Sequence, residues 1–229
     1  MSARSRTPGR LAALADLCLA LALVLAAGSA APLVVAGFAP ASGLIGVVVA
    51  QGVVILAGLA LLCYWRGVTF TGLGLVAPGW RDVLRGVQLL VIVFAVNILL
   101  RLFVMQLFPD AVSGQLARIT ELGNRVAGGI GVPELLGLSL FIGLYEELLA
   151  RGFLLQRARE LLGGLWGPVL LSSLLFGLGH VYQGAFGVIQ TALVGAILAV
   201  AVLRYASLWP AIIAHALINA VSLWVLAAT

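Results

Sequence analysis

The sequence contains no lysine, only two cysteines and two histidines, and little charge of either sign. Charged residues make up 9% of its 229 residues and hydrophobic residues 63%, which is far outside the range of soluble globular proteins. The basic residues are all arginines that flank apolar runs instead of forming a patch, so we expect no nucleic-acid partner. This composition indicates an integral membrane protein whose main partner is the lipid bilayer.

Several familiar chemical signatures are also missing. Cys18 and Cys63 lie inside apolar runs, where a free cysteine behaves as a small hydrophobic residue, so we predict no disulfide. The chain has no HExxH, no paired cysteine ligands, no GxxxxGK phosphate loop and no GxSxG. Any chemistry must therefore come from other polar residues.

Apolar stretches of about 20 residues, long enough to cross a hydrocarbon core, recur along the whole chain. We predict an all-α, polytopic membrane bundle of about seven transmembrane helices, within a range of roughly six to eight, forming one domain over residues 1–229. The expected spans are Leu11–Gly37, Gly43–Trp65, Val83–Phe108, Pro133–Gln156, Gly167–Val181, Phe186–Leu203 and Leu208–Ala227.

The arginines predict the topology. By the positive-inside rule, the basic N-terminus lies in the cytoplasm, and alternation of the spans brings the later basic loops to the same side. These residues are Arg4, Arg6, Arg10, Arg66, Arg81, Arg85, Arg157, Arg159 and Arg204. A cleaved signal peptide begins similarly, but Asp16 interrupts the first apolar run and further spans follow at once, which favours an uncleaved helix. The use of arginine in place of lysine points to a bacterial inner membrane.

Two connecting segments stand out. Arg66 to Trp80 is rich in glycine and is expected to be a cytoplasmic loop. Pro109 to Val132 is the longest polar region and is expected outside. Its leucine and isoleucine residues recur at helical spacing, which predicts an interfacial helix, with a plain connector as the alternative.

Polar residues inside the predicted spans are the candidates for function, because a charge in the bilayer centre is costly and normally faces a bundle interior or a wet cavity. Glu147 and Arg151 are spaced i, i+4 with the acid first, which favours an ion pair. Glu146 points about 100° away from Glu147. A purely structural role, with Arg151 reaching the headgroups and Glu147 neutralising it, leaves Glu146 unexplained.

The two histidines lie in two further spans. His180 follows Phe176 by one turn, and His215 precedes Asn219 by one turn. Measured from the expected cytoplasmic ends, Glu146, His180 and His215 lie roughly 10 to 20 Å deep and can meet in one cavity. A carboxylate and two imidazoles can activate water directly or through a metal, and Asn219 can donate to an oxyanion. Hydrolysis of an amide at membrane depth is the predicted reaction.

These three motifs, Glu146-Glu147-xxx-Arg151, Phe176-xxx-His180 and His215-xxx-Asn219, resemble those of the CPBP (CAAX protease and bacteriocin-processing, Abi) family of intramembrane proteases, which includes the type II CAAX prenyl endopeptidases. The resemblance covers about residues 133–227. It implies a cavity open to the cytoplasm, with Glu146 as the water-activating base helped by His180. His215 and Asn219 would stabilise the oxyanion, and Glu147 and Arg151 would orient the site.

Other questions stay open at this level. No obligatory cofactor is expected, although Glu146, His180 and His215 also suit a divalent metal such as zinc. The substrate is expected to be a membrane-associated or prenylated peptide or protein. The alternative functions are a non-catalytic membrane scaffold and a proton-coupled transporter. Small residues of the second span, such as Gly52 and Gly58, suit either packing within one chain or self-association, so the oligomeric state is unknown.

Overall fold

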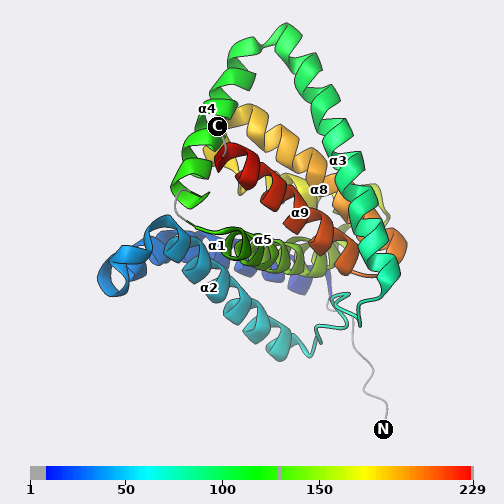
Figure 1. Ribbon diagram of the computed structural model, residues 1–229. Helices are drawn as coiled ribbons and strands as arrows, with labels where there is room; N and C mark the ends of the chain where they lie inside the picture. Colours follow the sequence, from blue (N-terminus) through cyan, green and yellow to red (C-terminus); the bar gives the residue numbers. More distant parts are fainter. Residues whose placement is uncertain (1–8, 128–129, 228–229) are drawn as a thin grey trace.

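The computed structural model describes residues 9–127 and 130–227, and the secondary structure within these ranges is all helical. Figure 1 shows the arrangement. The α-helices are α1 (Arg10–Phe38), α2 (Gly43–Arg66), α3 (Trp80–Leu107), α4 (Pro109–Ala127), α5 (Val132–Glu147), α6 (Leu155–Leu162), α7 (Trp166–Leu178), α8 (Gly184–Tyr205) and α9 (Trp209–Ala227). A π-helical segment, η2 (Leu148–Leu154), joins α5 to α6, and short 3-10 turns are η1 (Pro40–Ser42) and η3 (Val181–Gln183).

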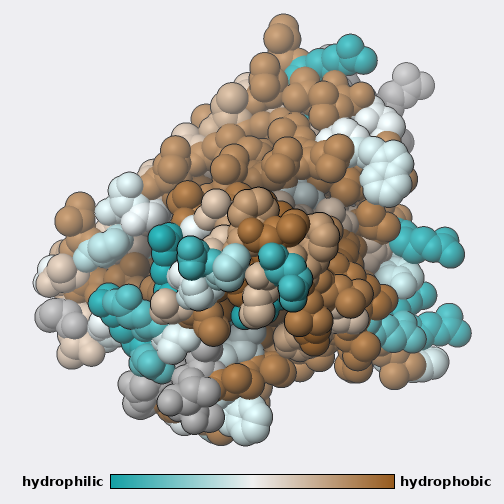
Figure 2. Space-filling model, turned by 90° about the horizontal axis from the view of Figure 1, so that it is seen from above, coloured by the Kyte–Doolittle hydropathy of each residue, from teal (hydrophilic) through white to brown (hydrophobic). Residues whose placement is uncertain are grey.

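The long helices are those of an integral membrane protein. Among the described residues, four segments are long and apolar enough to cross a membrane, and two shorter apolar helices accompany them. The four are Arg10–Phe38, Gly43–Arg66, Trp80–Leu107 and Val181–Tyr205, and the two are Trp166–Leu178 and Trp209–Val225. Apolar side chains cover most of the face shown in Figure 2. Such a surface is stable in lipid and would be an aggregation hazard in water.

Two of the seven expected spans differ from the prediction. The span expected at residues 133–156 is not one α-helix, because it changes to π-helical geometry at Leu148 and returns to α-helix at Leu155. The span expected at residues 167–181 is shorter, because α7 ends at Leu178. At 1.5 Å per residue its 13 residues extend about 20 Å, less than the roughly 30 Å hydrocarbon core. His180 therefore lies just beyond α7 and not inside it.

The structure also defines the conformation of the two connecting segments, the loop after α2 and the polar stretch after α3. The loop after α2 begins at Gly67, whose φ of 64° is the left-handed conformation that ends helices. The polar stretch after α3 forms the helix α4, so the alternative of a plain connector is wrong. Ile119 and Leu122 of this helix face the interior, and Glu121 and Arg125 are exposed and paired with each other. In Figure 1, α3 rises from the lower right and α4 descends on the left.

Small residues let the helices of the C-terminal half pack closely. A Cβ atom on Gly143 of α5 would lie 3.0 Å from the backbone nitrogen of Ala216 and 3.1 Å from the carbonyl oxygen of Ile212, both in α9. A Cβ atom on Gly177 of α7 would lie 2.6 Å from the carbonyl oxygen of Val188 in α8. Backbone atoms therefore meet without intervening side chains, which is the usual packing of helices in membranes.

The N-terminal helices pack through glycine as well. A Cβ atom on Gly52 would lie 2.5 Å from the ring of Phe141, and one on Gly58 would lie 2.5 Å from Leu23. Both glycines are thus used for packing within the chain. Cys18 is exposed, Cys63 is buried, and both are free cysteines, as predicted.

Seven arginines gather at one end of the bundle, which we call the arginine face. Arg85 lies 4.4 Å from the ring centre of Tyr205, next to Arg204. Asp16 of α1 is fully buried and contacts Arg66 of α2 at 2.5 Å and Arg157 of α6 at 3.6 Å. The members of this face are Arg10, Arg66, Arg81, Arg85, Arg157, Arg159 and Arg204. These helix ends lie toward the lower right of Figure 1, opposite α4.

Candidate active site

A buried carboxylate, Glu147, joins two helices at the centre of the bundle. Its Oε1 atom accepts a hydrogen bond from Nη1 of Arg151 at 2.7 Å and a second from Nδ1 of His215 at 2.7 Å. Glu147 has an exposed fraction of 0% and Arg151 of 1%. Burial of an ion pair is tolerated only with such additional hydrogen bonds. The predicted Glu147–Arg151 pair is confirmed, and it also holds the imidazole of His215.

Phe176 packs against the basic groups of the site. Its ring lies 4.1 Å from the guanidinium carbon of Arg151, a cation–π contact. The ring centre is 4.8 Å from that of His180 and 5.9 Å from that of His215, which it meets edge-on. Phe176 therefore packs against both imidazoles. The one-turn spacing in the sequence indicated this contact for His180 alone.

The two histidines present equivalent nitrogen atoms to Glu146. The Nδ1 atom of His180 is 2.9 Å from the carbonyl oxygen of Phe176, so it carries the proton and donates it. The Nδ1 atom of His215 likewise donates to Glu147. Each Nε2 atom is then directed at Glu146 Oε2, at 3.9 Å for His180 and 3.7 Å for His215. These gaps are too long for direct hydrogen bonds.

Glu146 itself is only partly buried, and its two oxygens differ. Oε1 accepts a hydrogen bond from the hydroxyl of Tyr145 at 3.3 Å. Oε2 is inaccessible and has no hydrogen-bond partner among the described residues. Catalytic contacts often tighten only when the substrate binds, so Oε2 would gain its donor through a small movement of the side chains around it.

A cavity of about 790 Å³ adjoins this cluster. Glu146, His180, His215 and Asn219 all line it, together with apolar side chains of α2, α3 and α4. A mostly apolar cavity with a few convergent polar groups is the usual form of a binding site. The structure thus brings together, around one cavity, four of the six residues selected from sequence, and it places Glu147 and Arg151 directly behind them.

The comparison with known families agrees with this geometry. Residues 129–221 match the family described as type II CAAX prenyl endopeptidase Rce1-like. This segment is an Rce1-like domain. The recognition made from the three motifs is confirmed, and the matched range lies close to the residues 133–227 expected from sequence. No curated protein and no solved structure matches the chain significantly.

The Rce1-like domain begins just before α5 and ends within α9, so it contains every residue of the cluster around Glu146. Membership of this family implies proteolysis within a membrane and a protein substrate. The first four helices lie outside the match, yet α2, α3 and α4 supply part of the cavity wall.

Glu146, His180 and His215 are ligand types that zinc accepts. Among the residues that the structure describes, however, no group of three or more His, Cys, Asp or Glu residues is positioned to hold a metal ion.

Two contacts of the site were not predicted from the sequence: that of Tyr145 with Glu146, and that of Glu147 with His215. The second joins residues 68 positions apart and leaves no local pattern. The serines before Phe176 have packing roles: Ser172 donates to the carbonyl oxygen of Val169, and Ser173 lies against Gly195.

Proposed function

We propose that the protein is an intramembrane endopeptidase in which Glu146 activates a water molecule to hydrolyse a peptide bond. The observation that supports this proposal is the position of Glu146 Oε2, which faces the Nε2 atoms of both histidines at the wall of the cavity. A carboxylate within one water of its target proton meets the geometric requirement for a general base.

The histidines take different parts in this mechanism. His180 shares the water with Glu146 and relays its proton to the leaving amine. His215 donates from Nε2 to the developing oxyanion when both of its nitrogens are protonated. The negative charge of Glu147 beside Nδ1 stabilises that imidazolium, as a buried carboxylate does in other catalytic pairs. Asn219, one turn along α9 and on the cavity wall, is the second oxyanion donor.

Glu147 and Arg151 are positioning residues in this scheme. They do not line the cavity, and their ion pair fixes the ring of His215 from behind. The catalytic unit is the Rce1-like segment within one transmembrane domain. The cavity suits a membrane-associated polypeptide, prenylated or not, because apolar side chains dominate its wall.

The test is cleavage of quenched-fluorescent peptides, with and without a prenyl group, by purified protein in detergent. Wild type is compared with Glu146→Gln, and Glu134→Gln is the matched control, since Glu134 is an exposed acid in the first turn of the same helix. We expect cleavage by wild type and by the control, and at least a hundredfold loss in Glu146→Gln.

A strong chelator added to the same assay separates two mechanisms. Unchanged cleavage supports water activation by Glu146 without a metal, whereas loss that zinc restores would show a metal-dependent enzyme. If wild type is well folded and cleaves none of the peptides, or if Glu146→Gln is as active as wild type, the proposed mechanism is wrong.

A further inference from the structure

A second set of polar side chains lines the cavity beside Glu146, and it comes from helices that carry none of the three motifs. Asn97 and Arg101 belong to α3, Gln115 to α4 and Gln190 to α8. We call these four residues the polar wall. Charged and polar residues at membrane depth are costly and usually mark a functional site. The mechanism proposed above uses none of the four, so their presence needs a separate explanation.

Arg101 is the only arginine among the described residues that line the cavity. It lies inside the candidate span α3, six residues before the helix ends at Leu107. No carboxylate in the described part of the chain forms an ion pair with its guanidinium. The cavity wall therefore carries a positive charge without a counter-ion, and an anionic group that entered the cavity would be attracted to it.

Contacts between three helices hold Arg101 at the cavity. The side-chain nitrogen of Gln115 donates to Oε1 of Gln190, which leaves Oε1 of Gln115 directed at Arg101. Nη2 of Arg101 lies 3.5 Å from that oxygen, which is long for a hydrogen bond. An arginine with a purely structural role would extend to the lipid headgroups instead of lining a cavity. Because a guanidinium has five N–H donors, most of those on Arg101 are available to a ligand.

Asn97 gives a second, independent indication that this wall binds a ligand. It lies one turn before Arg101 on the same face of α3 and also lines the cavity. Its Oδ1 atom is buried and has no hydrogen-bond partner among the described residues. Buried polar atoms without a partner are uncommon in proteins, and the N–H group of a bound peptide would satisfy this one. Arg101 and Asn97 together therefore match a carboxylate and a neighbouring peptide group.

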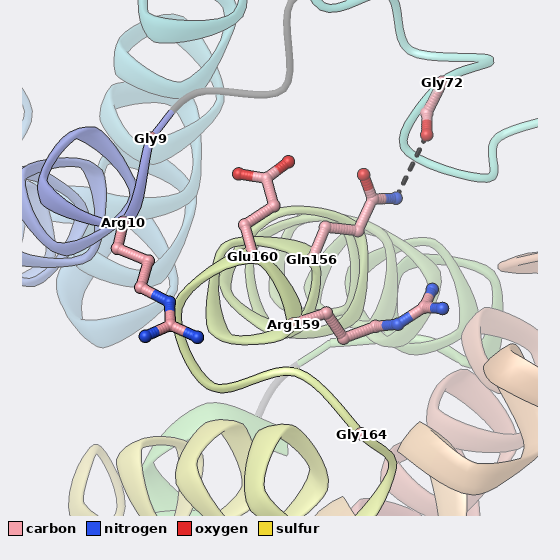
Figure 3. Close-up of a pocket in the computed structure, with 7 residues that line it drawn as sticks. All are labelled: Gly9, Arg10, Gly72, Gln156, Arg159, Glu160 and Gly164. Atoms are coloured by element: carbon pink, nitrogen blue, oxygen red, sulfur yellow. Dashed lines mark hydrogen bonds between the residues drawn. The ribbon is translucent and has the colours of Figure 1, made fainter.

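A second pocket, at the arginine face, also contains arginines, but their surroundings differ. Figure 3 shows it between the start of α1, the loop after α2 and α6. Arg10 and Arg159 are exposed there, and the carboxylate of Glu160 lies on the same wall. This pocket shares no residue with the cavity beside Glu146. Its arginines are screened by solvent and by an acid, whereas Arg101 faces a mostly apolar cavity that contains the proposed catalytic residues.

We propose that Arg101 is a specificity-determining residue that binds a carboxylate of the substrate. This inference rests on the proposed function, since it requires a polypeptide that occupies the cavity with one peptide bond at Glu146. Arginine binds carboxylates through paired, charge-assisted hydrogen bonds, which are stronger where water is excluded. The carboxylate comes either from the C-terminus of the polypeptide or from an Asp or Glu side chain near the cleaved bond. Asn97 accepts a hydrogen bond from the N–H group beside it.

The test compares quenched-fluorescent peptides in pairs that differ by one carboxylate. One pair has a free or an amidated C-terminus, and the other pairs have Asp or Asn at a single position beside the cleaved bond. The proteins are wild type, Arg101→Met, Arg101→Lys and the control Arg118→Met, because Arg118 is an exposed arginine of α4 that does not line the cavity. If Arg101→Met does not fold, Arg101→Gln replaces it.

We expect wild type and Arg118→Met to cleave the carboxylate form of one pair with a kcat/KM about 10- to 100-fold higher than the neutral form, mainly through KM. Arg101→Met should lose this preference and Arg101→Lys should keep part of it, since lysine retains the charge but not the paired donors. The pair that shows the preference identifies the source of the carboxylate. Equal cleavage of both forms by wild type, or an unchanged preference in Arg101→Met, would overturn the proposal.

Binding measured without cleavage separates this inference from the peptidase function. The same peptide pairs, carrying one fluorophore, are titrated with Glu146→Gln, and their anisotropy reports the affinity. We expect the carboxylate form to bind at least tenfold more tightly, and the difference to vanish in Glu146→Gln, Arg101→Met. That pattern in a protein whose wild type cleaves no peptide would reject the peptidase function and support the carboxylate site. Cleavage with equal binding of both forms would support the peptidase function and reject the carboxylate site.

Discussion

Replacement of Glu147 by leucine separates the stability role of this carboxylate from its role in positioning His215. The substitution leaves the guanidinium of Arg151 buried without its counter-ion, and the Nδ1 atom of His215 without its acceptor. Removing one partner of a buried pair costs about 3–5 kcal/mol. For a chain of this size that corresponds to a fall in melting temperature of roughly 6–20 °C.

The double variant Glu147→Leu, Arg151→Met removes both charges at similar side-chain volume. Most of the penalty from the uncompensated charge should disappear, which leaves the lost hydrogen bond of His215, worth about 1–3 kcal/mol. The double variant should therefore melt at a higher temperature than the single variant. Peptide cleavage should stay low in both, because His215 has lost the group that orients it.

Thermal unfolding in detergent, followed by tryptophan fluorescence, and the peptide assay measure the two effects. Glu121 and Arg125 provide the control, because they form an i, i+4 ion pair of the same 2.7 Å length with both side chains 65% exposed. Replacing them in the same way should change stability by no more than about 1 kcal/mol. Recovery of cleavage in the Glu147→Leu, Arg151→Met variant would refute a positioning role for Glu147.

Two further predictions concern α5 and α9. Gly143→Ala should lower activity by at least tenfold, because its Cβ atom would meet two backbone atoms of α9 at 3.0 and 3.1 Å and move Glu147 away from His215. Gly137→Ala is the control. No atom lies within 4 Å of its added Cβ, so this variant should behave as wild type. Asn219→Ala should lower kcat by about a hundredfold or more with little change in KM if it stabilises the oxyanion. Ser222→Ala, on the same cavity wall, is the matched control. If Ser222→Ala lowers kcat as much as Asn219→Ala does, Asn219 is not an oxyanion donor.

The sequence predicted most of the helices because long apolar runs have few alternatives in a membrane. The expected span at residues 43–65 and the helix α2, for example, end within one residue of each other. The change to π-helix at Leu148 was not predicted, because a hydrogen-bond shift from i+4 to i+5 leaves no signature in composition. The early end of α7 was missed because no proline or charged residue marks it in the sequence between Leu178 and Val181.

Contacts within one helix of the site were predicted from the sequence, whereas contacts between helices were not. Local spacing was enough for the pair Glu147 and Arg151, since both lie on one helix. The choice of Glu146 followed from the cost of an unexplained charge in a membrane. The contact between Glu147 and His215, and the way several helices line one cavity, depend on how distant helices pack. Single-helix periodicity contains no information about that packing.

The buried Asp16 has a consequence for how the chain enters the membrane during synthesis. Its counter-ions, Arg66 and Arg157, belong to segments made after α1, the first of them 50 residues later. Until then α1 carries an uncompensated carboxylate less than two turns from its start, where the cost of insertion is below the roughly 3 kcal/mol of the bilayer centre but still unfavourable. We therefore expect α1 to settle fully only after the segment with Arg157 has emerged from the ribosome, so that chains truncated before it expose a charged, unassembled helix to membrane quality control.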